Sequence, residues 1–425
     1  MPARMTSWGA TLLWMLPLGI ILISAGFYGA DAPLASLLLS AGLIVPTTVI
    51  VITGRQPPSL LTWFAAGVLA AFCGYGFWRG WIISGAHEYA VLIAAAAVFY
   101  FAKAGAQSSK RADQMWLFTL FAGGVLVAAG FLDFMSDPST NFGRERPYHQ
   151  DRLSAPFLSA NTAATFCSLV LLQSLGQLMR HSRRIDDSDG RWVELLISKV
   201  SLPIITLLLA VSALFLTASR AGVVAAMIAA ILLIGWEMSA RLKRREASGS
   251  TLMALAWLFI FSAVLAAAYF LSGEMFWERM TIADADVTRQ SSLSSYFDAI
   301  WYQPLFGHGL GGFQFVNDFV AGNGDADLLQ GQGAAHNVYL QWMIQAGLVG
   351  ATAMFGAMLV IVFRLLRGLR RRQRQRSMIR TAIVIVVFVG LHGLVDYGLE
   401  IPFISWWLAW LLGISVGTAS RTGRS

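Results

Sequence analysis

The chain has 425 residues, of which 56% are hydrophobic and 13% are charged, and its mean hydropathy is +0.62. This composition excludes an ordinary soluble domain and indicates a membrane protein. The net charge of +8 does not indicate nucleic-acid binding, because the cations lie in short stretches between apolar segments, where retention of positive loops in the cytoplasm explains them. Cys73 and Cys167 lie inside apolar segments, where we expect small buried hydrophobic residues without a redox role.

Apolar stretches of a length that crosses a membrane recur along the whole chain. They predict an all-α polytopic membrane protein, a single integral membrane domain over residues 1–425 with about twelve transmembrane helices, since about 17 to 25 apolar residues cross a hydrocarbon core. We place these helices at residues 10–28, 34–52, 60–78, 89–106, 115–132, 159–178, 198–217, 222–238, 252–271, 336–363, 378–395 and 403–418.

The distribution of cations predicts the orientation of these helices. With the N-terminus in the cytoplasm, 24 of the 31 Lys and Arg residues fall on the cytoplasmic side. The C-terminus is then cytoplasmic as well. Two outer loops follow from this orientation, a short one at residues 133–158 and a long one at residues 272–335, between the ninth and tenth helices.

The short outer loop leads into the predicted helix at 159–178 through polar residues. Arg152 precedes this helix, and Asn161 lies near its outer end. An asparagine at this position can cap the helix, or it can contact a ligand. The sequence leaves both interpretations open.

Arg220 lies in a very short turn, at residues 217–222, between two predicted helices. An arginine at membrane depth costs roughly 2.5 to 3.5 kcal/mol, so its guanidinium must reach the interface or face a polar cavity. The small neighbours Ser219, Ala221 and Gly222 favour a polar cavity, because they allow a ligand to approach the guanidinium closely.

The long outer loop contains an amphipathic segment that begins just after Arg289. Its apolar residues recur at helical spacing, which predicts a helix lying on the outer leaflet with its aromatic face toward the lipid. These residues are Leu293, Tyr296, Phe297, Ile300 and Trp301. Pro304 ends this predicted helix, and the glycines that follow permit tight backbone turns.

Two other patterns in the long loop do not predict a cofactor. Residues 307–312 have the spacing of a dinucleotide-binding loop, but no strand–helix–strand pattern surrounds them, so we reject a nicotinamide cofactor. The aspartate pairs at 284/286 and 325/327 offer oxygen ligands of the kind that bind divalent cations. We expect them instead to be solvated loop residues, and we predict no metal site.

His336 lies at the outer end of the predicted helix at 336–363. An unperturbed imidazole has a pKa of about 6.5 and can accept a proton at neutral pH. A single histidine here is often an interface residue. Its combination with outward-facing arginines favours a functional site.

Taken in order, these residues resemble the O-antigen ligase and polymerase superfamily of bacterial inner-membrane glycosyltransferases. The resemblance covers the chain from about residue 150 to its end. It is carried by Arg152, Phe157, Asn161, Ser219-Arg220-Ala221-Gly222, Arg289, Pro304, Gly307-His308-Gly309, Phe313, His336-Asn337-Val338-Tyr339-Leu340, His392 and Asp396. The segment 157–165 is similar to members that polymerise exported polysaccharides, although Ser159 and Ala160 stand where those members more often carry polar or basic residues.

The resemblance implies a reaction at the periplasmic face of the bacterial inner membrane, without a cofactor. An acceptor sugar hydroxyl attacks the anomeric carbon of a glycan linked to polyprenyl diphosphate. Arg220 and Arg289 match the family's essential arginines and would stabilise the diphosphate, and His336 matches its histidine and would act as general base. Further implied contacts are Arg152, Asn161, Asn337 and Tyr339 for substrate, with His392 and Asp396 in support.

The implied partners are the lipid-linked oligosaccharide, an acceptor glycan or glycolipid, membrane lipids, and flippase and chain-length or export proteins, but not nucleic acid. We expect polymerisation of repeat units of an exopolysaccharide or O-antigen. One alternative is a ligase that joins the glycan to lipid A-core. A twelve-helix secondary transporter is the alternative from another class, and it is disfavoured because the two halves show no correspondence.

Overall fold

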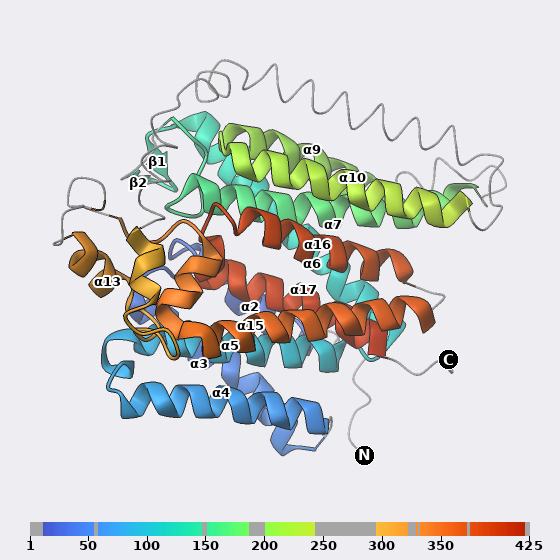
Figure 1. The fold of residues 1–425 in the computed structure, drawn as a ribbon. Coiled ribbons are helices and arrows are strands. Elements are labelled where there is room, and N and C mark those ends of the chain that lie inside the picture. The colour runs from blue at the N-terminus through green and yellow to red at the C-terminus, as the bar shows by residue number, and fades with distance from the viewer. Residues whose placement is uncertain are drawn as a thin grey trace. The chain divides into compact units, whose positions relative to one another are not determined.

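The computed structural model describes residues 12–54, 58–146, 151–186, 200–242, 295–321, 329, 332–371 and 375–420. Helices make up almost all of its regular structure (Figure 1). The exception among the described residues is a short antiparallel hairpin of β1 (Thr140–Asn141) and β2 (Arg144–Glu145). The predicted all-helical class is therefore confirmed.

Every predicted apolar stretch that falls on described residues forms a helix, because a backbone in lipid must satisfy its own hydrogen bonds. The long helices are α2 (Leu16–Ala25), α3 (Pro33–Ile52), α4 (Leu60–Trp78), α5 (Ile82–Gly105), α6 (Ser109–Ser136), α7 (Ala160–Asp186), α9 (Ser201–Leu216), α10 (Arg220–Leu242), α15 (Val338–Arg371), α16 (Arg376–His392) and α17 (Pro402–Ser420). Among the described residues, eight helices have the length and apolar composition to cross a membrane. The stretch 252–271 lies outside the described residues, and the total of twelve spans stays a prediction.

The chain divides into two compact units. The first comprises Met1–Gln107, Ile282–Phe363 and Gly393–Gly417. In it, α3 packs along α5, and α17 approaches α5 closely through two glycines. A Cβ at Gly413 would lie 2.5 Å from the Phe99 carbonyl oxygen, and one at Gly417 would lie 2.5 Å from that of Lys103. Only glycine permits this approach of the two helices.

The second unit comprises Ser108–Thr281, Arg364–His392 and Thr418–Ser425, and α7 is its central helix. Residues 162–179 of α7 are all buried, with α6, α9, α10 and α16 packed around them. Two of the polar side chains of α7 bond to neighbouring helices. Gln173 donates to the Trp116 carbonyl at 2.9 Å, and Ser174 pairs with Thr206 at 2.8 Å.

A buried ion pair joins two outer helices of the second unit. Arg380 of α16 donates to Glu237 of α10 at 2.6 Å, and both side chains are almost inaccessible to solvent. A buried charge is tolerated when an opposite charge and hydrogen bonds replace its hydration. This pair therefore fixes the pairing of α10, which begins at Arg220, with α16.

The predicted continuous helix at 336–363 is wrong in one respect, because α15 is broken at Gly347. This glycine has φ 62° and ψ −172°, which is far from helical geometry. Residues 304–309 hydrogen-bond to both sides of the break. His308 N and Gly309 N donate to the carbonyls of Ile344 and Gln345 at 2.9 and 2.8 Å. On the far side, the Leu348 and Val349 amides donate to the carbonyls of residues 304 and 305 at 2.8 and 3.0 Å.

The segment at residues 295–321 also departs from its prediction. Residues 295–300 are helical, and α13 (Phe313–Val320) follows them. Tyr296 and Ile300, predicted to face lipid, are buried against α13 instead, whereas Phe297 and Trp301 are exposed. The apolar face is wide enough to be shared between a protein core and an outer surface, and spacing alone does not divide it.

Candidate active site

Arg220 is the first residue of α10, and the turn before it is held by its own side chains. Thr217 donates to the Leu214 carbonyl at 2.6 Å and accepts from the Ser219 amide at 3.3 Å. Ala218 has a left-handed backbone with φ 47°. Ser219 accepts from the Gly222 amide at 3.4 Å, which is the geometry of a helix N-cap. The half-buried Arg220 side chain is thus presented by a fixed turn.

Arg152 holds this turn from the loop before α7. Its Nε donates to the Thr217 carbonyl at 2.7 Å, and its Nη2 donates to Asn161 Oδ1 at 3.1 Å. Next to it, the Leu153 amide donates to the Leu216 carbonyl at 2.9 Å. Arg152 is buried. The structure therefore brings together three of the predicted site residues, Arg152, Asn161 and Arg220, around one turn.

Asn161 does not cap α7 through its side chain in this structure. Its Oδ1 accepts from Arg152, and its own amide donates to Ser159 Oγ at 3.2 Å. Ser159 Oγ therefore takes a backbone amide in the first turn of α7, as a capping side chain does. The interpretation of Asn161 as a side-chain cap is therefore wrong, and its contact with a ligand stays a prediction.

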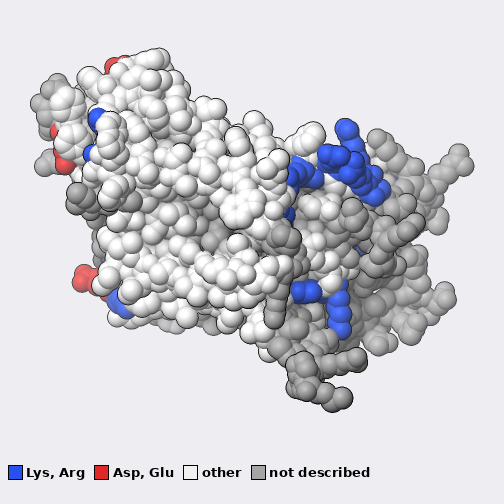
Figure 2. Space-filling model, turned by 90° about the horizontal axis from the view of Figure 1, so that it is seen from below, with Lys and Arg blue, Asp and Glu red and all other residues white. Residues whose placement is uncertain are grey.

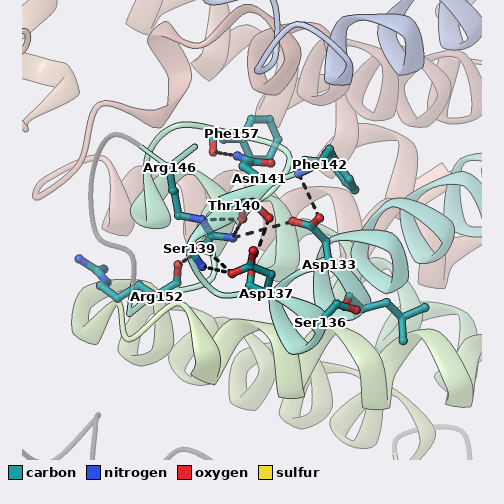
Figure 3. Close-up of polar contacts among 11 residues, drawn as sticks. Asp133, Ser136, Asp137, Ser139, Thr140, Asn141, Phe142, Arg146, Arg152 and Phe157 are labelled. Atoms are coloured by element: carbon teal, nitrogen blue, oxygen red, sulfur yellow. Dashed lines mark hydrogen bonds and ion pairs between the residues drawn. The ribbon is translucent and has the colours of Figure 1, made fainter. Parts of the chain in front are cut away.

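Arg146 is a further organising residue, which the sequence presented only as one of several charges in the loop (Figure 3). Its guanidinium is buried and donates to the Thr140 carbonyl through Nε at 3.1 Å and Nη2 at 2.7 Å. Its Nη1 donates to the Arg152 carbonyl, and Asp133 lies 3.9 Å from Nη2. Arg146 thereby ties the β1–β2 hairpin and the end of α6 to the backbone of Arg152.

One sequence signal, the glycine at position 143, could have revealed the hairpin that Arg146 stabilises. Phe142 and Gly143 connect the two strands, and both have positive φ, 51° and 74°. Two central residues with positive φ are the requirement of a tight two-residue hairpin turn, and glycine at the second position is typical of it. The contact of Arg146 with Arg152 has no comparable signal, because it depends on the folded loop.

His336 lies two residues before the start of α15, with a left-handed backbone of φ 51°. The next residue, Asn337, accepts the Leu340 amide at 3.0 Å as the cap of α15 and donates to the Leu394 carbonyl at 2.9 Å. The Val338 amide donates to the Gly393 carbonyl at 2.8 Å. The start of α15 is thus fixed on the segment that follows α16, within the first unit.

The His336 ring packs edge-on against Tyr397, with 5.0 Å between centroids and an interplanar angle of 80°. Asp396, the neighbour of Tyr397, is buried and accepts the Gly398 amide at 3.0 Å. Tyr339 stacks on Phe355 at 5.1 Å. Asp396 is therefore adjacent in sequence to the tyrosine that contacts the His336 ring. The side chain of Asn337 bonds to backbone groups at the start of α15 and at Leu394.

His392, the last residue of α16, belongs to the second unit. It is buried, its Nδ1 lies 3.0 Å from Thr165 Oγ1, and its ring stacks on Phe388 at 5.7 Å. Its contact with α7 gives it a supporting position in the bundle. The helix predicted at 378–395 ends at this histidine.

The remaining predicted catalytic residue, Arg289, lies outside the described residues, as do both aspartate pairs of the long loop. Of the other two, Arg220 belongs to the second unit and His336 to the first. Each is held in its own unit at the first turn of a long helix or directly before it. A helix N-terminus carries a partial positive charge, which favours anions there.

Glu400 marks a polar cluster that the sequence analysis missed. It ends the short 3₁₀ helix η3 (Gly398–Glu400), and its carboxylate accepts hydrogen bonds from the side chains of Trp342 and Gln345. Removal from water, together with the nearby charge of Glu88, raises the pKa of Glu400 from an ordinary 4.5 to about 8. Gln345 Oε1 also accepts the Gly311 amide at 3.1 Å. The cluster thus links η3, α15 and the glycine-rich loop.

The long apolar helices are those of a multi-pass membrane protein, and the predicted residues Arg220 and His336 lie at helix ends in the two units. Residues 205–355 match the family model described as O-antigen ligase. The predicted relation of the chain to the O-antigen ligase and polymerase superfamily is therefore confirmed over these residues. The matched region includes Arg220, Arg289 and His336. No curated protein matches the chain.

This match supports a function of the O-antigen ligase or polymerase type in polysaccharide biosynthesis. The glycine-rich run 307–312, in contrast, has a structural role. Residues 304–309 form the hydrogen-bonding partner of the broken α15, and a Cβ at Gly309 would lie 2.6 Å from the Trp81 ring. Its likeness to a dinucleotide-binding loop is confined to spacing.

Proposed function

We propose that this protein is a glycosyltransferase of the bacterial inner membrane, which moves a glycan from polyprenyl diphosphate to a sugar hydroxyl at the periplasmic face. The observation that carries the proposal is the placement of Arg220, inside the O-antigen ligase domain, at the start of a long helix in a turn clamped by Arg152. A fixed guanidinium beside a helix N-terminus suits a diphosphate.

In the proposed reaction, the acceptor oxygen forms a bond to the anomeric carbon while the bond from that carbon to the diphosphate oxygen breaks. The leaving diphosphate takes the electron pair, and negative charge develops on its oxygens. Arg220 and Arg289 stabilise this charge, since a planar guanidinium can donate two parallel hydrogen bonds to phosphate oxygens. His336 accepts the proton of the acceptor hydroxyl.

The membrane orientation in this proposal rests on the distribution of charges along the helices. On the face shown in Figure 2, wide stretches of the described surface carry no charged side chain. In α15, all the arginines, from Arg364 to Arg371, lie in the last two turns, far from His336. With that end in the cytoplasm, the His336 end faces the periplasm.

We further propose that the acceptor is the growing chain, so that the enzyme polymerises repeat units of a surface polysaccharide on undecaprenyl diphosphate. The similarity of residues 157–165 to polysaccharide polymerases supports this assignment. The description of the matched family as O-antigen ligase supports the alternative, in which a completed glycan is joined to lipid A-core. A flippase and chain-length or export proteins are the expected partners of either enzyme.

Deletion of the gene, followed by mass spectrometry of the lipid-linked glycans, tests both forms of the proposal. Loss of a polymerase leaves single repeat units on the lipid, whereas loss of a ligase leaves long chains on it. Complementation with Arg220→Lys should restore little glycan, because an ammonium group cannot reproduce the bidentate contact. An unchanged lipid-linked pool in the deletion strain would contradict glycosyl transfer altogether.

A further inference from the structure

A set of large apolar side chains is exposed on residues 297–319 in the first unit, outside the long helices. We call it the aromatic patch, and each member is more than half exposed. Its members are Phe297, Trp301, Tyr302, Leu305, Phe315 and Phe319. Soluble surfaces rarely gather so many large apolar residues, and such a patch usually marks a contact with a protein or a membrane.

The aromatic patch has a defined structure beneath it. The opposite sides of the same two helical segments are buried in one apolar cluster that includes Tyr296, Ile300, Phe313 and Val316. The Tyr296 hydroxyl donates to the buried Asn317, which in turn donates to the Leu329 carbonyl at 3.1 Å. The segment is therefore packed on its inner side, and its outward aromatic residues are not the result of loose packing.

The exposed rings also contact one another. Phe297 and Trp301 lie 6.4 Å apart between centroids at an interplanar angle of 76°. Tyr302 and Phe319 lie 5.5 Å apart at 86° and join the two helical segments across the surface. Edge-to-face contacts of this kind add about 0.5 to 1.5 kcal/mol to simple burial. Ring contacts thus hold these four side chains in place before any partner binds.

The patch continues directly into the outward face of α15. The Leu305 carbonyl accepts the Val349 amide at 3.0 Å, so the patch is attached to the start of the apolar span after Gly347. Leu348 and Val349 are exposed, and Leu359 and Phe363 are exposed farther along the span. In a helix with the composition of a membrane span, these side chains face lipid.

Polar residues mark where the patch ends on α13. Phe315 and Phe319 are four residues apart and share one side of this helix. Gln314 and Asp318 occupy the adjacent side, and Gln314 donates to Asp318 at 2.9 Å. An aromatic strip beside a polar strip is typical of a helix that lies along a membrane interface, where Trp and Tyr are enriched.

We propose that the aromatic patch is immersed in the lipid leaflet at the Gly347 end of α15, so that residues 297–319 rest on the bilayer and anchor the glycine-rich loop at its surface. The occupant of the patch is membrane lipid, because the patch is continuous with the lipid-facing side of a span. This inference depends on the membrane fold and not on the proposed reaction.

Spin labels in the full-length protein test this proposal. In a chain with Cys73→Ala and Cys167→Ala, a nitroxide is attached to Phe315→Cys or, as the matched control one position away on α13, to Gln314→Cys. The protein is reconstituted in phosphatidylcholine and phosphatidylglycerol vesicles. Power saturation then compares collisions with oxygen, which concentrates in lipid, with collisions with a water-soluble nickel chelate.

The label at Phe315 should collide more with oxygen than with the nickel chelate, and the label at Gln314 should show the reverse ratio. Equal nickel access at both positions would overturn the proposal, because the patch would then lie in water. Low access to both reagents at Phe315 would overturn it as well, since a second copy of the chain would then cover the patch. Trp301→Cys gives a second labelling position with the same expected ratio, if the Phe315 variant does not fold.

Discussion

A buried guanidinium lowers stability unless hydrogen bonds replace its hydration, and Arg152 meets this requirement with the Thr217 carbonyl and the Asn161 side chain. These two bonds join residues that are 65 and nine positions apart in the sequence. Arg152 therefore acts on Arg220 through the turn before α10. Its role in the protein is structural whether or not substrate also reaches it.

We expect Arg152→Ala to lower the free energy of unfolding by about 1.5 to 3 kcal/mol, the range for a buried hydrogen bond to a charged group. The thermal transition of the detergent-solubilised protein, followed by size-exclusion chromatography, measures this effect. Arg144→Ala, at an exposed position on β2, is the matched control and should change it by less than about 0.5 kcal/mol. An unchanged unfolding temperature in Arg152→Ala would mean that the hydrogen bonds of Arg152 do not stabilise the turn before α10.

The His336 prediction concerns rate and its dependence on pH. Loss of a general base typically lowers the rate by about 10²- to 10⁴-fold, so His336→Ala should be almost inactive while folded. In the wild type, glycan transfer should fall as the pH drops through the pKa of the imidazole, because the protonated ring cannot accept a proton. Transfer by purified protein from pH 5.5 to 8.5 measures both effects.

His87→Ala, a second partly exposed histidine of the first unit, is the control and should keep the wild-type rate and pH profile. A folded His336→Ala protein with near wild-type transfer would remove this residue from the mechanism.

The sequence was a good guide to single residues at helix ends and a poor guide to their partners. Arg220 and His336 were selected because polar residues interrupt apolar runs, and those interruptions coincide with the starts of α10 and α15. The contacts of Arg152 with Thr217 and of Arg146 with Arg152 could not be predicted, because they join loops that only the folded chain brings together.

At the scale of elements, apolar length predicted each described span, but it did not predict the break in α15 or the burial of α7. The break depends on backbone partners supplied by residues 304–309. The burial of α7 depends on the helices around it, and α7 is the least apolar of the eight described helices that could cross a membrane. Both features arise from tertiary contacts.

Gly347→Ala should destabilise the protein by about 1 to 3 kcal/mol, because a left-handed φ of 62° strains any residue with a Cβ. The added Cβ would also clash with the backbone of Leu305 and Gly307. Gly356→Ala, on the same helix, is the matched control. Its Cβ meets nothing within 4 Å, so it should be neutral or stabilising by up to about 1 kcal/mol. Equal unfolding temperatures for the two variants would contradict the break in α15 at Gly347.

Glu400 predicts a dependence of stability on pH. Its pKa is about 8 in the folded protein and 4.5 ordinarily, so the folded state binds a proton more tightly than the unfolded state. The stability that this raised pKa confers on the folded state is fully present below pH 4.5 and is lost as the pH rises through about 8. The temperature of thermal unfolding should therefore decrease as the pH is raised from 5 to 8.5. Glu400→Gln should remove this part of the decrease, and an identical decrease in the variant would contradict the assignment.

At the scale of the whole molecule, the proposed topology predicts which ends of the helices meet an impermeant reagent. Asp318 on α13 and Arg371 at the end of α15 are both exposed. In intact cells with a permeabilised outer membrane, a charged maleimide should label Asp318→Cys but not Arg371→Cys. Lysed cells should show labelling of both, and the parent chain reports any background from Cys73. The opposite pattern in intact cells would reverse the orientation.

The break at Gly347 has a consequence for how this chain can vary in length. In a continuous α-helix, one inserted residue turns everything beyond it by about 100°. In α15, residues 304–309 fix the backbone on both sides of the break, so an insertion in the span near Gly356 rotates the distal part and leaves residues 338–346 in place. The span can therefore be adapted to bilayers of different thickness while His336 and Asn337 keep their orientation.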